Sequence, residues 1–287
     1  MTRIRWHALA LWLSVGSAAA LAVAPVEHAP RQAAAAQPAA AEMQACAQIW
    51  TGREAEFETY LRTAEVTEMK EVPVGVTRPS RAYFAPGGLA ASMAWKVLPP
   101  GMRNGYFESY RSEIAAYELD KILDLHMIPP TVERRLKGEV GAAILWASPT
   151  RSFKELGGVP GQSGAAGPPA ARVAEWIRQI VRAKMFDNLI GNQDPNLGNW
   201  LLDGDWHLIL IDHTRAFTNM KTLVHKMDNV DRALWDKILA LDETTLESAV
   251  GPWMGRGERR AILERRGRMQ QEIDRLVQAR GDGVFLK

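Results

Sequence analysis

The strongest constraint in the sequence is a carboxylate at the end of an apolar strand. Residues 206–212 read Trp-His-Leu-Ile-Leu-Ile-Asp, so Asp212 ends a run that a sheet would bury. Burying an ionised carboxylate costs on the order of several kcal/mol unless it is paired or binds a cation. Asp194 and Asn199, in the preceding loop, are the nearest candidates to share a site with it. Because the Asp203-Gly204-Asp205 turn predicts a hairpin, we expect Asp212 to return to that loop.

This order of a loop with Asp-x-x-x-x-Asn, a short hairpin and a second Asp matches the catalytic apparatus of protein kinases. In kinases the first Asp accepts the proton of the attacking hydroxyl, and the Asn and second Asp hold Mg²⁺. Carboxylate and amide oxygens bind such a cation while leaving coordination positions for phosphate. The local pattern is weak alone, because Asp-x-x-x-x-Asn is common by chance. The N-terminal half must therefore supply the other parts.

Two charged residues in the N-terminal half fit those parts. Lys96 is central in the expected strand Ala-Ser-Met-Ala-Trp-Lys-Val-Leu, and Glu113 lies near the start of the next expected helix. Kinases need a strand lysine paired with a helix glutamate. The alternative for Lys96 is an edge-strand lysine that discourages aggregation. The alternative for Glu113 is a charge favoured by the helix macrodipole, and Glu118 competes with it for the pairing role.

Three stretches together resemble a known family: EIAAYELDKILDLHMIPPTV from residue 113, IGNQDPNLGNW from residue 190 and LILIDHTRAF from residue 208. They resemble the secretory-pathway atypical kinases, the group of the Golgi casein kinase and the glycan xylose kinase. More distantly, they are similar to the HipA-type and phosphatidylinositol kinases. The resemblance covers about residues 72–217 and joins several motifs in order.

The resemblance implies a role for each of five polar residues. Lys96 would contact the α- and β-phosphates of ATP, and Glu113 would orient it; in some secretory kinases this glutamate also helps to hold the metal. Asp194 would be the catalytic base. Asn199 and Asp212 would be ligands of Mg²⁺ or Mn²⁺.

The resemblance also implies a hinge and reveals departures from the family pattern. Trp146 and Ala147 would form the hinge where backbone groups bind adenine. Gly75 stands alone where protein kinases carry a Gly-x-Gly-x-x-Gly loop over the phosphates. Pro195 replaces the arginine that usually follows the catalytic Asp, and His213-Thr214 replaces the Phe-Gly after the metal Asp.

Two classes of function follow from these residues. The first is an ATP- and metal-dependent phosphotransferase acting on a hydroxyl of a protein, a glycan or a lipid headgroup. The second is a pseudokinase that binds nucleotide or partners as a scaffold. Presence of all five polar residues favours the enzyme, because a scaffold has no need for buried like charges. Pro195 and the sparse glycine loop favour the scaffold.

The expected fold class is α+β, with a small β-rich lobe and a mainly helical lobe in a kinase-like domain over residues 46–287. We predict lobes at about 60–156 and 168–287, separated by the Gly/Pro/Ser-rich loop Gly157–Pro169. The expected elements are strands over 72–77, 81–85 and 91–98, a helix over Tyr106–Leu125, a β pair over about Thr131–Trp146, a helix over Ala171–Leu189, and helices from about Lys221.

The N-terminus has the pattern of an export signal. Arg3 and Arg5 precede the apolar run Ala8–Val23, and Ala18-Ala19-Ala20 and Ala22-Val23-Ala24 towards its end offer small-residue cleavage sites. We predict a signal peptide or an uncleaved membrane anchor over 1–24 and an Ala/Pro/Gln-rich linker over 25–45. The protein would then be periplasmic or secreted, or anchored to the membrane by this segment.

A calcium site at the central loop is excluded by its residues. Asn192, Asp194, Asn196 and Asp203 fall at ligand positions of a calcium-loop template, but Leu197 occupies the glycine position and no bidentate Glu closes it.

Other features indicate ordinary structural roles. A net charge of +2 gives no reason to expect a nucleic-acid partner. The basic segment Arg256–Arg268 is expected to be a helix with a solvated face. His207 and His213 are expected to be hydrogen-bonded structural residues. The single cysteine, Cys46, has no partner for an internal disulfide and is interpreted as incidental.

Overall fold

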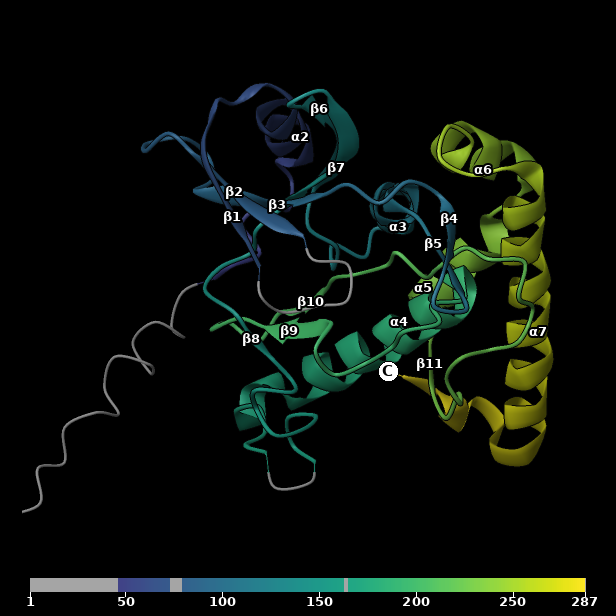
Figure 1. Cartoon of the computed structure of the whole chain (residues 1–287). Coiled ribbons are helices and arrows are strands. Elements are labelled where there is room, and N and C mark those ends of the chain that lie inside the picture. The colour runs from purple at the N-terminus through teal and green to yellow at the C-terminus, as the bar shows by residue number, and fades with distance from the viewer. Residues whose placement is uncertain (1–45, 73–78, 163–164, 287) are drawn as a thin grey trace, which may run out of the picture. The chain divides into compact units, whose positions relative to one another are not determined.

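A computed structural model describes residues 46–72, 79–162 and 165–286 (Figure 1). The predicted signal or anchor over 1–24, the predicted linker over 25–45 and Gly75 lie outside the described residues, as does nearly all of the strand expected over 72–77. Among the described residues, no helix is both long enough and apolar enough to span a membrane.

The N-terminal lobe is built on a five-stranded antiparallel sheet in the order β1-β2-β3-β7-β6. Its strands are β1 (Val66–Glu71), β2 (Ser80–Phe84), β3 (Ser92–Lys96), β6 (Thr131–Leu136) and β7 (Glu139–Leu145). Helix α2 (Glu54–Thr63) precedes the sheet, and helix α3 (Tyr110–Leu123) joins β3 to β6 through the hairpin of β4 (Gly101–Arg103) and β5 (Tyr106–Glu108).

The two helices cover opposite faces of this sheet. Along β7, Ala143 belongs to the buried cluster that contains residues of α2, whereas Ala142 belongs to the cluster that contains Ile114 of α3. This alternation follows from the two-residue period of a strand. Lys96 lies directly opposite Ala142 in the ladder, and residues directly opposite one another share a face. The register of β3 and β7 therefore places Lys96 on the α3 side.

The C-terminal lobe is mainly helical. Helix α4 (Val173–Ile190) packs against α7 (Arg256–Arg280) and against a three-stranded sheet in the order β10-β9-β8 (Figure 1). The sheet contains β8 (Arg151–Ser152), β9 (Trp200–Leu202) and β10 (Leu208–Leu210). The remaining elements are α5 (Arg232–Ala240), α6 (Glu243–Val250), the parallel pair β11 (Val230–Asp231) and β12 (Phe285–Leu286), and 3-10 turns over Ala170–Arg172 and Gly281–Val284.

The helix expected over Tyr106–Leu125 is shorter in the structure. Ser109 is extended, and its side chain accepts the N–H of Arg111, which fixes Tyr110 as the first helical residue. The residues before it form β5 instead. Asp124 adopts a left-handed conformation and ends the helix after Leu123.

The chain leaves the N-terminal sheet before the predicted boundary loop Gly157–Pro169. β8 pairs with β9 of the C-terminal lobe, and Phe153 is fully buried in that lobe's core. Residues 151–156 therefore pack with the C-terminal lobe, and the chain changes lobe at Trp146–Thr150. The described residues of the loop Gly157–Pro169 belong to the C-terminal lobe, where Val159 packs against the core. Glycine and proline predict a turn-rich connection but do not indicate which two cores it joins.

Candidate functional site

The centre of the candidate site is an ion triad contributed by three distant elements. The amino group of Lys96 lies 2.5 Å from Oε1 of Glu113 and 2.9 Å from Oδ1 of Asp212. The Lys96 and Glu113 side chains are 6% and 3% exposed, whereas that of Asp212 is 28% exposed. The triad therefore has a buried end at the glutamate and an accessible end at the aspartate.

The two carboxylates decide the ionisation of the lysine. Burial by itself lowers the pKa of Lys96, but the negative charges of Asp212 and Glu113 outweigh it and raise that pKa above its ordinary value. Burial likewise favours the neutral form of Glu113, but Lys96 and His213 hold the pKa of this carboxyl below its usual range. Lys96 and Glu113 are thus both charged at neutral pH.

Local structure explains why these groups meet. Lys96 faces α3 because of its register on β3, and the Ser109 cap places Glu113 in the first turn of that helix. The second oxygen of Glu113 accepts the backbone N–H of His213 at 3.0 Å. Glu113 therefore ties the lysine to the backbone that directly follows Asp212.

The hairpin of β9 and β10 brings the backbone of Asn199 beside Ile211, the residue directly before Asp212. The backbone N–H of Ile211 donates to the carbonyl of Asn199 at 3.0 Å. Asp212 has a φ of +61°, a left-handed backbone conformation that is uncommon for non-glycine residues. Its Oδ1 also accepts the Thr214 hydroxyl at 3.1 Å. Asp212 is thus held in an unusual turn by bonds on both sides.

Asp194 lies in the loop that follows α4, and the loop is fixed by its own amides. The side chain of Asn199 donates to the Asp194 carbonyl at 3.2 Å. Asn192 accepts the backbone N–H of Asp194 at 3.1 Å and donates to the buried Asp187 at 3.0 Å. The Asp194 carboxylate is 32% exposed and accepts a 2.9 Å bond from Asn196.

One charged residue of the site, Arg215, was not singled out from the sequence. Its guanidinium bonds Oε1 of Glu108 at 2.8 Å and Oδ2 of Asp194 at 3.3 Å, and it lies 4.3 Å from the ring centroid of Tyr106. A cation thus stands beside Asp194 although Pro195 displaces the expected arginine. Because Pro195 leaves the position after Asp194 without a charge, the sequence could have indicated Arg215, three residues after Asp212, as a substitute cation.

The predicted hinge residues, Trp146 and Ala147, follow directly after β7 in the chain. The backbone N–H of Trp146 donates to the Ser92 carbonyl at 3.2 Å, which continues the pairing of β7 with β3. The Arg81 guanidinium lies 4.2 Å from the Trp146 ring centroid. The Ala147 carbonyl accepts a 3.3 Å bond from the Thr150 hydroxyl. The structure does not bring either residue into the polar cluster described above.

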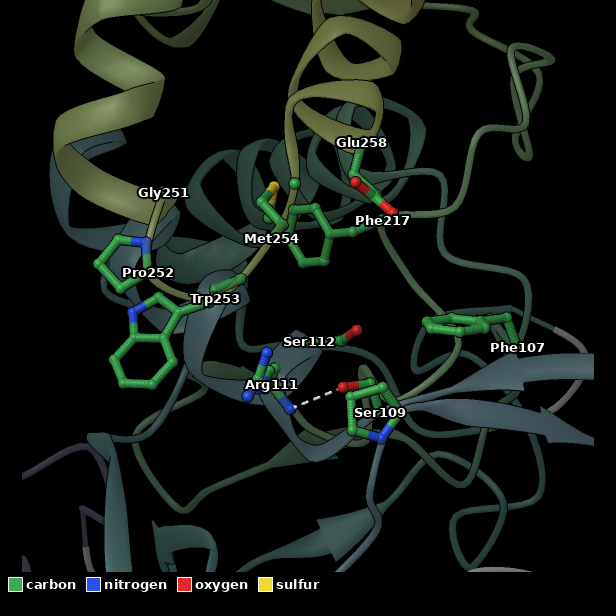
Figure 2. Close-up of a pocket in the computed structure, with 13 residues that line it drawn as sticks. Phe107, Ser109, Arg111, Ser112, Phe217, Gly251, Pro252, Trp253, Met254 and Glu258 are labelled. Atoms are coloured by element: carbon green, nitrogen blue, oxygen red, sulfur yellow. Dashed lines mark hydrogen bonds between the residues drawn. The ribbon is translucent and has the colours of Figure 1, made fainter.

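The cavity in Figure 2 is separate from the ion triad. Its volume is about 350 Å³, and it lies between the first turn of α3 and the turn that joins α6 to α7, where Trp253 and Met254 line it. Arg111, Ser109 and Ser112 contribute its polar wall. Lys96, Asp194, Asn199 and Asp212 are not among its lining residues, so it does not carry the chemistry of the site.

The donor atoms around Asp212 suit a divalent cation and a phosphate. Asp212 and Asn199 offer carboxylate and amide oxygens, the ligands that Mg²⁺ and Mn²⁺ prefer. Because the Asn199 amide nitrogen is used by the Asp194 carbonyl, its side-chain oxygen is left to accept or coordinate. Lys96 supplies a charged donor within the same group of residues.

Comparison with known proteins gives structural but no sequence matches: no protein-family model and no curated protein sequence matches the chain. The structure is similar to that of the Golgi casein kinase, with a TM-score of 0.59, 14% identity, and coverage of 82% of this chain and 79% of that one. A second structure of the Golgi casein kinase, with Mn/ADP bound, gives a TM-score of 0.60 at 13% identity, with 82% and 79% covered.

Two further structures have the same fold. Hydra Fam20, solved with a sugar, gives a TM-score of 0.59 at 13% identity, covering 81% of this chain and 91% of that one. The Helicobacter pylori proinflammatory kinase CtkA gives 0.51 at 12% identity, covering 77% and 98%. The predicted α+β class and the predicted resemblance are both confirmed at the level of architecture. The chain has the atypical protein-kinase-like fold, with an antiparallel N-terminal sheet and a helical C-terminal lobe.

Proposed function

We propose that the protein is an ATP- and divalent-metal-dependent phosphotransferase that acts on a hydroxyl acceptor. The observation that carries this proposal is the double ion pair of Lys96 with Glu113 and Asp212. Kinase activity needs the lysine–glutamate pair and the metal-binding aspartate in place together. In this chain the ammonium group of Lys96 on β3 meets both requirements, because it pairs with Glu113 of α3 and with Asp212 after the β9–β10 hairpin.

The proposed nucleotide site uses Lys96, Asn199 and Asp212. A bound Mg²⁺ or Mn²⁺ would neutralise charge on the phosphates of ATP. Asp212 and Asn199 would hold it through hard oxygen atoms, and Lys96 would bind the phosphates. The Golgi casein kinase was solved with Mn/ADP, which supports this choice of ligand. Trp146, Ala147 and Gly75 remain the proposed contacts to adenine and phosphate.

Asp194 is the proposed base. Its carboxylate is accessible enough to meet an acceptor hydroxyl, whereas the buried Glu113 is not. Arg215 and Asn196 each bind one of its oxygens, so the carboxylate has a defined orientation. A positioned base of this kind takes the hydroxyl proton as the oxygen attacks phosphorus, and this step contributes about 10²–10⁴-fold to rate in enzymes.

A pseudokinase is the second candidate, and the surroundings of Asp194 favour it. Both oxygens of Asp194 are engaged by Arg215 and Asn196, and Pro195 stands where related kinases have an arginine. A scaffold would bind nucleotide through Lys96 and Asp212 without transferring phosphate. Retention of the complete charged set supports the enzyme over the scaffold.

Thermal unfolding with ATP or ADP, each with Mg²⁺, with Mn²⁺ and without metal, tests the proposed ligands. Specific binding stabilises the folded state by RT ln(1 + [L]/Kd), about 2.7 kcal/mol at a ligand concentration of 100 Kd. We expect the melting temperature to rise only when nucleotide and metal are both present. Binding followed by appearance of ADP would support the enzyme, and binding without ADP formation would support the scaffold. Absence of any nucleotide effect would contradict both.

Export through the N-terminal segment is also proposed. Its test is the N-terminal sequence of the protein recovered from a periplasmic or secreted fraction, which should start after residue 20 if the signal is cleaved near Ala18-Ala19-Ala20 or Ala22-Val23-Ala24. Recovery of the intact N-terminus from membranes would indicate the anchor. Recovery of the intact protein only from cytosol would contradict both.

A further inference from the structure

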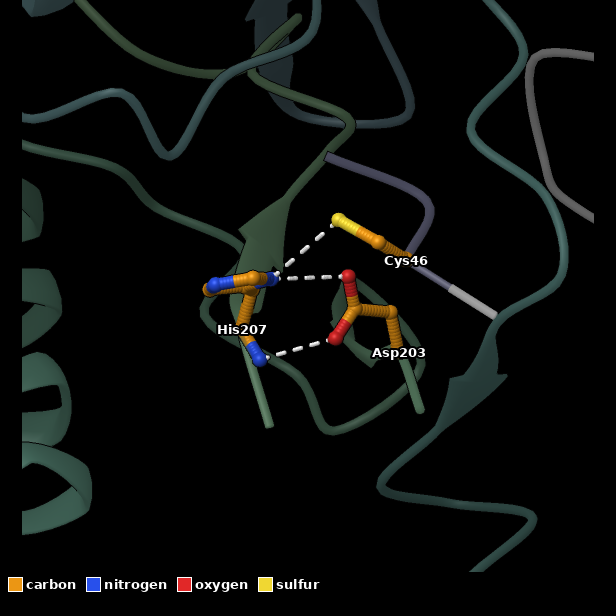
Figure 3. A group of neighbouring side chains, drawn as sticks. All are labelled: Cys46, Asp203 and His207. Atoms are coloured by element: carbon orange, nitrogen blue, oxygen red, sulfur yellow. Dashed lines mark hydrogen bonds and ion pairs between the residues drawn. The ribbon is translucent and has the colours of Figure 1, made fainter. Parts of the chain in front are cut away.

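Three metal-binding types of side chain meet at the turn of the β9–β10 hairpin (Figure 3). Sγ of Cys46 lies 3.7 Å from Nδ1 of His207, and that nitrogen lies 3.0 Å from Oδ2 of Asp203. The ligand atoms of all three residues lie within 4.8 Å of one another. This cluster is separate from the proposed nucleotide site and uses none of its residues.

The spacing is close to what one tetrahedral zinc ion requires. Zinc binds sulfur at about 2.3 Å, and imidazole nitrogen or carboxylate oxygen at about 2.0–2.2 Å, which at the tetrahedral angle gives roughly 3.5 Å between sulfur and nitrogen and roughly 3.3 Å between nitrogen and oxygen. The corresponding distances are 3.7 Å and 3.0 Å. These two distances are each within about 0.3 Å of the tetrahedral values, and the sulfur and the carboxylate oxygen lie within 4.8 Å of each other.

The cluster does not have the geometry of a nucleophilic triad. A Cys-His-Asp triad places the nucleophile and the carboxylate on different ring nitrogens, so that one nitrogen takes the proton while the other is oriented. Here the same nitrogen, Nδ1 of His207, faces both Cys46 and Asp203. Convergence of a thiol and a carboxylate on one nitrogen suits a shared cation instead.

Backbone bonds hold the carboxylate in place for this role. Oδ2 of Asp203 accepts the N–H groups of Ala47 at 2.9 Å and Gln48 at 3.3 Å. Oδ1 accepts those of Asp205 at 3.0 Å and His207 at 2.9 Å. Hydrogen bonds to a ligating carboxylate are the usual outer support of a metal site. They also keep Cys46, directly before Ala47, next to the carboxylate. Because Oδ2 has two lone pairs, the ion would take the place of the longer Gln48 bond while the Ala47 bond remains.

We infer that Cys46, Asp203 and His207 form a zinc site. Sγ of Cys46, Nδ1 of His207 and Oδ2 of Asp203 are its protein ligands, and a water molecule completes four-coordination. On binding, Cys46 releases its proton to solvent, and neutral His207 presents the lone pair of Nδ1 to the ion. The His207 side chain is 32% exposed and that of Asp203 is fully buried, so the open coordination position faces solvent on the histidine side.

The site would brace the two lobes against each other. Asp203 and His207 belong to the hairpin that carries Asn199 at its start and Asp212 at its end. Cys46 is followed by Ala47 and Trp50, both buried in the core cluster of the N-terminal sheet, to which Ile209 of β10 also belongs. The ion would therefore fasten the segment that enters the N-terminal lobe to the hairpin of the C-terminal lobe. This inference does not depend on the proposed phosphotransferase activity.

Cobalt provides a specific test, because Cys46 is the single cysteine of the chain. The metal-stripped full chain is titrated with Co²⁺ and then with Zn²⁺, in parallel with Cys46→Ser and His207→Gln. A thiolate-to-cobalt charge-transfer absorption can arise only from Cys46. His126→Gln is the matched control, since this side chain is 35% exposed against 32% for His207 and contacts carboxylates without being a ligand. Asp212→Asn controls for cation binding at the nucleotide site.

We expect one equivalent of Co²⁺ to produce the absorption and Zn²⁺ to remove it. Cys46→Ser should abolish the absorption, and both ligand variants should weaken zinc binding by more than about 100-fold, beyond the typical effect of losing an outer-shell partner. His126→Gln and Asp212→Asn should bind as the wild type does. Lack of absorption at stoichiometric Co²⁺, or unchanged zinc affinity in folded Cys46→Ser and His207→Gln, would overturn the inference. Circular dichroism establishes whether each variant folds. If only one of Cys46→Ser and His207→Gln folds, its zinc affinity alone tests the inference.

Discussion

Lys96 and Asp212 form a direct ion pair, with 2.9 Å between Nζ and Oδ1, although they are 116 positions apart in the chain. The pair joins the sheet of one lobe to the hairpin of the other. It also explains how an aspartate can stand at the end of an apolar strand, because Oδ1 of Asp212 is paired with the Lys96 cation. A metal–nucleotide complex at Asp212 would have to share or replace that cation.

Lys96→Met should destabilise the folded protein strongly. The substitution leaves Glu113, with a side chain only 3% exposed, without its cation, and removing one partner of a buried ion pair costs about 3–5 kcal/mol. Urea unfolding measures the loss. Lys70→Met is the control, because Lys70 is 59% exposed and pairs with the exposed Glu68; its unfolding midpoint should not change measurably. Equal effects of the two substitutions would contradict the structural role of Lys96.

Asp212→Asn should remove metal-dependent nucleotide binding while the protein still folds. The amide keeps the shape of the carboxylate and removes the charge that a hard cation needs, and Lys96 keeps its pair with Glu113. Titration calorimetry with ATP and Mn²⁺ gives the affinity. Asp236→Asn, at an exposed position on α5, is the matched charge control. Wild-type affinity in Asp212→Asn would place the metal elsewhere.

Arg215→Met should reduce both stability and phosphotransfer. The substitution strands Glu108, which is 2% exposed, and removes the cation next to Asp194. Adding Glu108→Gln should restore most of the stability, because the neutral amide is easier to bury, but it should not restore transfer. Unfolding midpoints and ADP formation are measured on the two single variants and the double variant. Recovery of transfer together with stability would show that Arg215 acts only through folding.

Asp120 should make stability depend on pH. Burial raises the pKa of this carboxyl to about 7, against the opposing effect of the N–H groups of Met127 and Ile128. A raised folded-state pKa means that the native state binds more protons than the unfolded state between about pH 4 and pH 7. The stability contributed by Asp120 is therefore greatest below this window and falls as the pH rises through it.

The comparison with Asp120→Asn isolates this effect from other titrating groups. The asparagine oxygen can still accept the two backbone bonds but does not ionise. The unfolding free energy of the variant relative to wild type should therefore rise by on the order of a few kcal/mol from pH 4 to pH 8. A difference that stays constant over this range would contradict the raised pKa.

Much of the site was predictable because it depends on local rules. The alternation of β3 and the serine cap of α3 determine where Lys96 and Glu113 point, and the Asp-Gly turn predicts the hairpin to Asp212. The edge strand β1, Val66–Glu71, was missed because its side chains are half-buried or exposed and it lacks an apolar alternation. Cys46 was interpreted as incidental because its neighbours Asp203 and His207 are more than 150 residues away in sequence.

Arg265 shows a further limit of the sequence pattern. The basic stretch of α7 was expected to be solvated, yet Arg265 is 0% exposed and its pKa is lowered by burial to about 10. Its guanidinium donates to the carbonyls of Leu189, Thr218 and Met220. These acceptors lie at the end of α4 and beyond Asp212, and no pattern within α7 specifies contacts so distant in sequence.

Transfer of the terminal phosphate of ATP, monitored by phosphorus NMR in the presence of Mg²⁺ for wild type and Asp194→Ala, tests the proposed activity most directly. Water or a supplied protein, glycan or lipid hydroxyl can serve as acceptor. We expect wild type to convert ATP to ADP and Asp194→Ala to do so about 10²–10⁴-fold more slowly while binding ATP with unchanged affinity. Equal rates in the two proteins, or no conversion by a wild-type protein that binds ATP and Mg²⁺ with every acceptor class supplied, would contradict the phosphotransferase account.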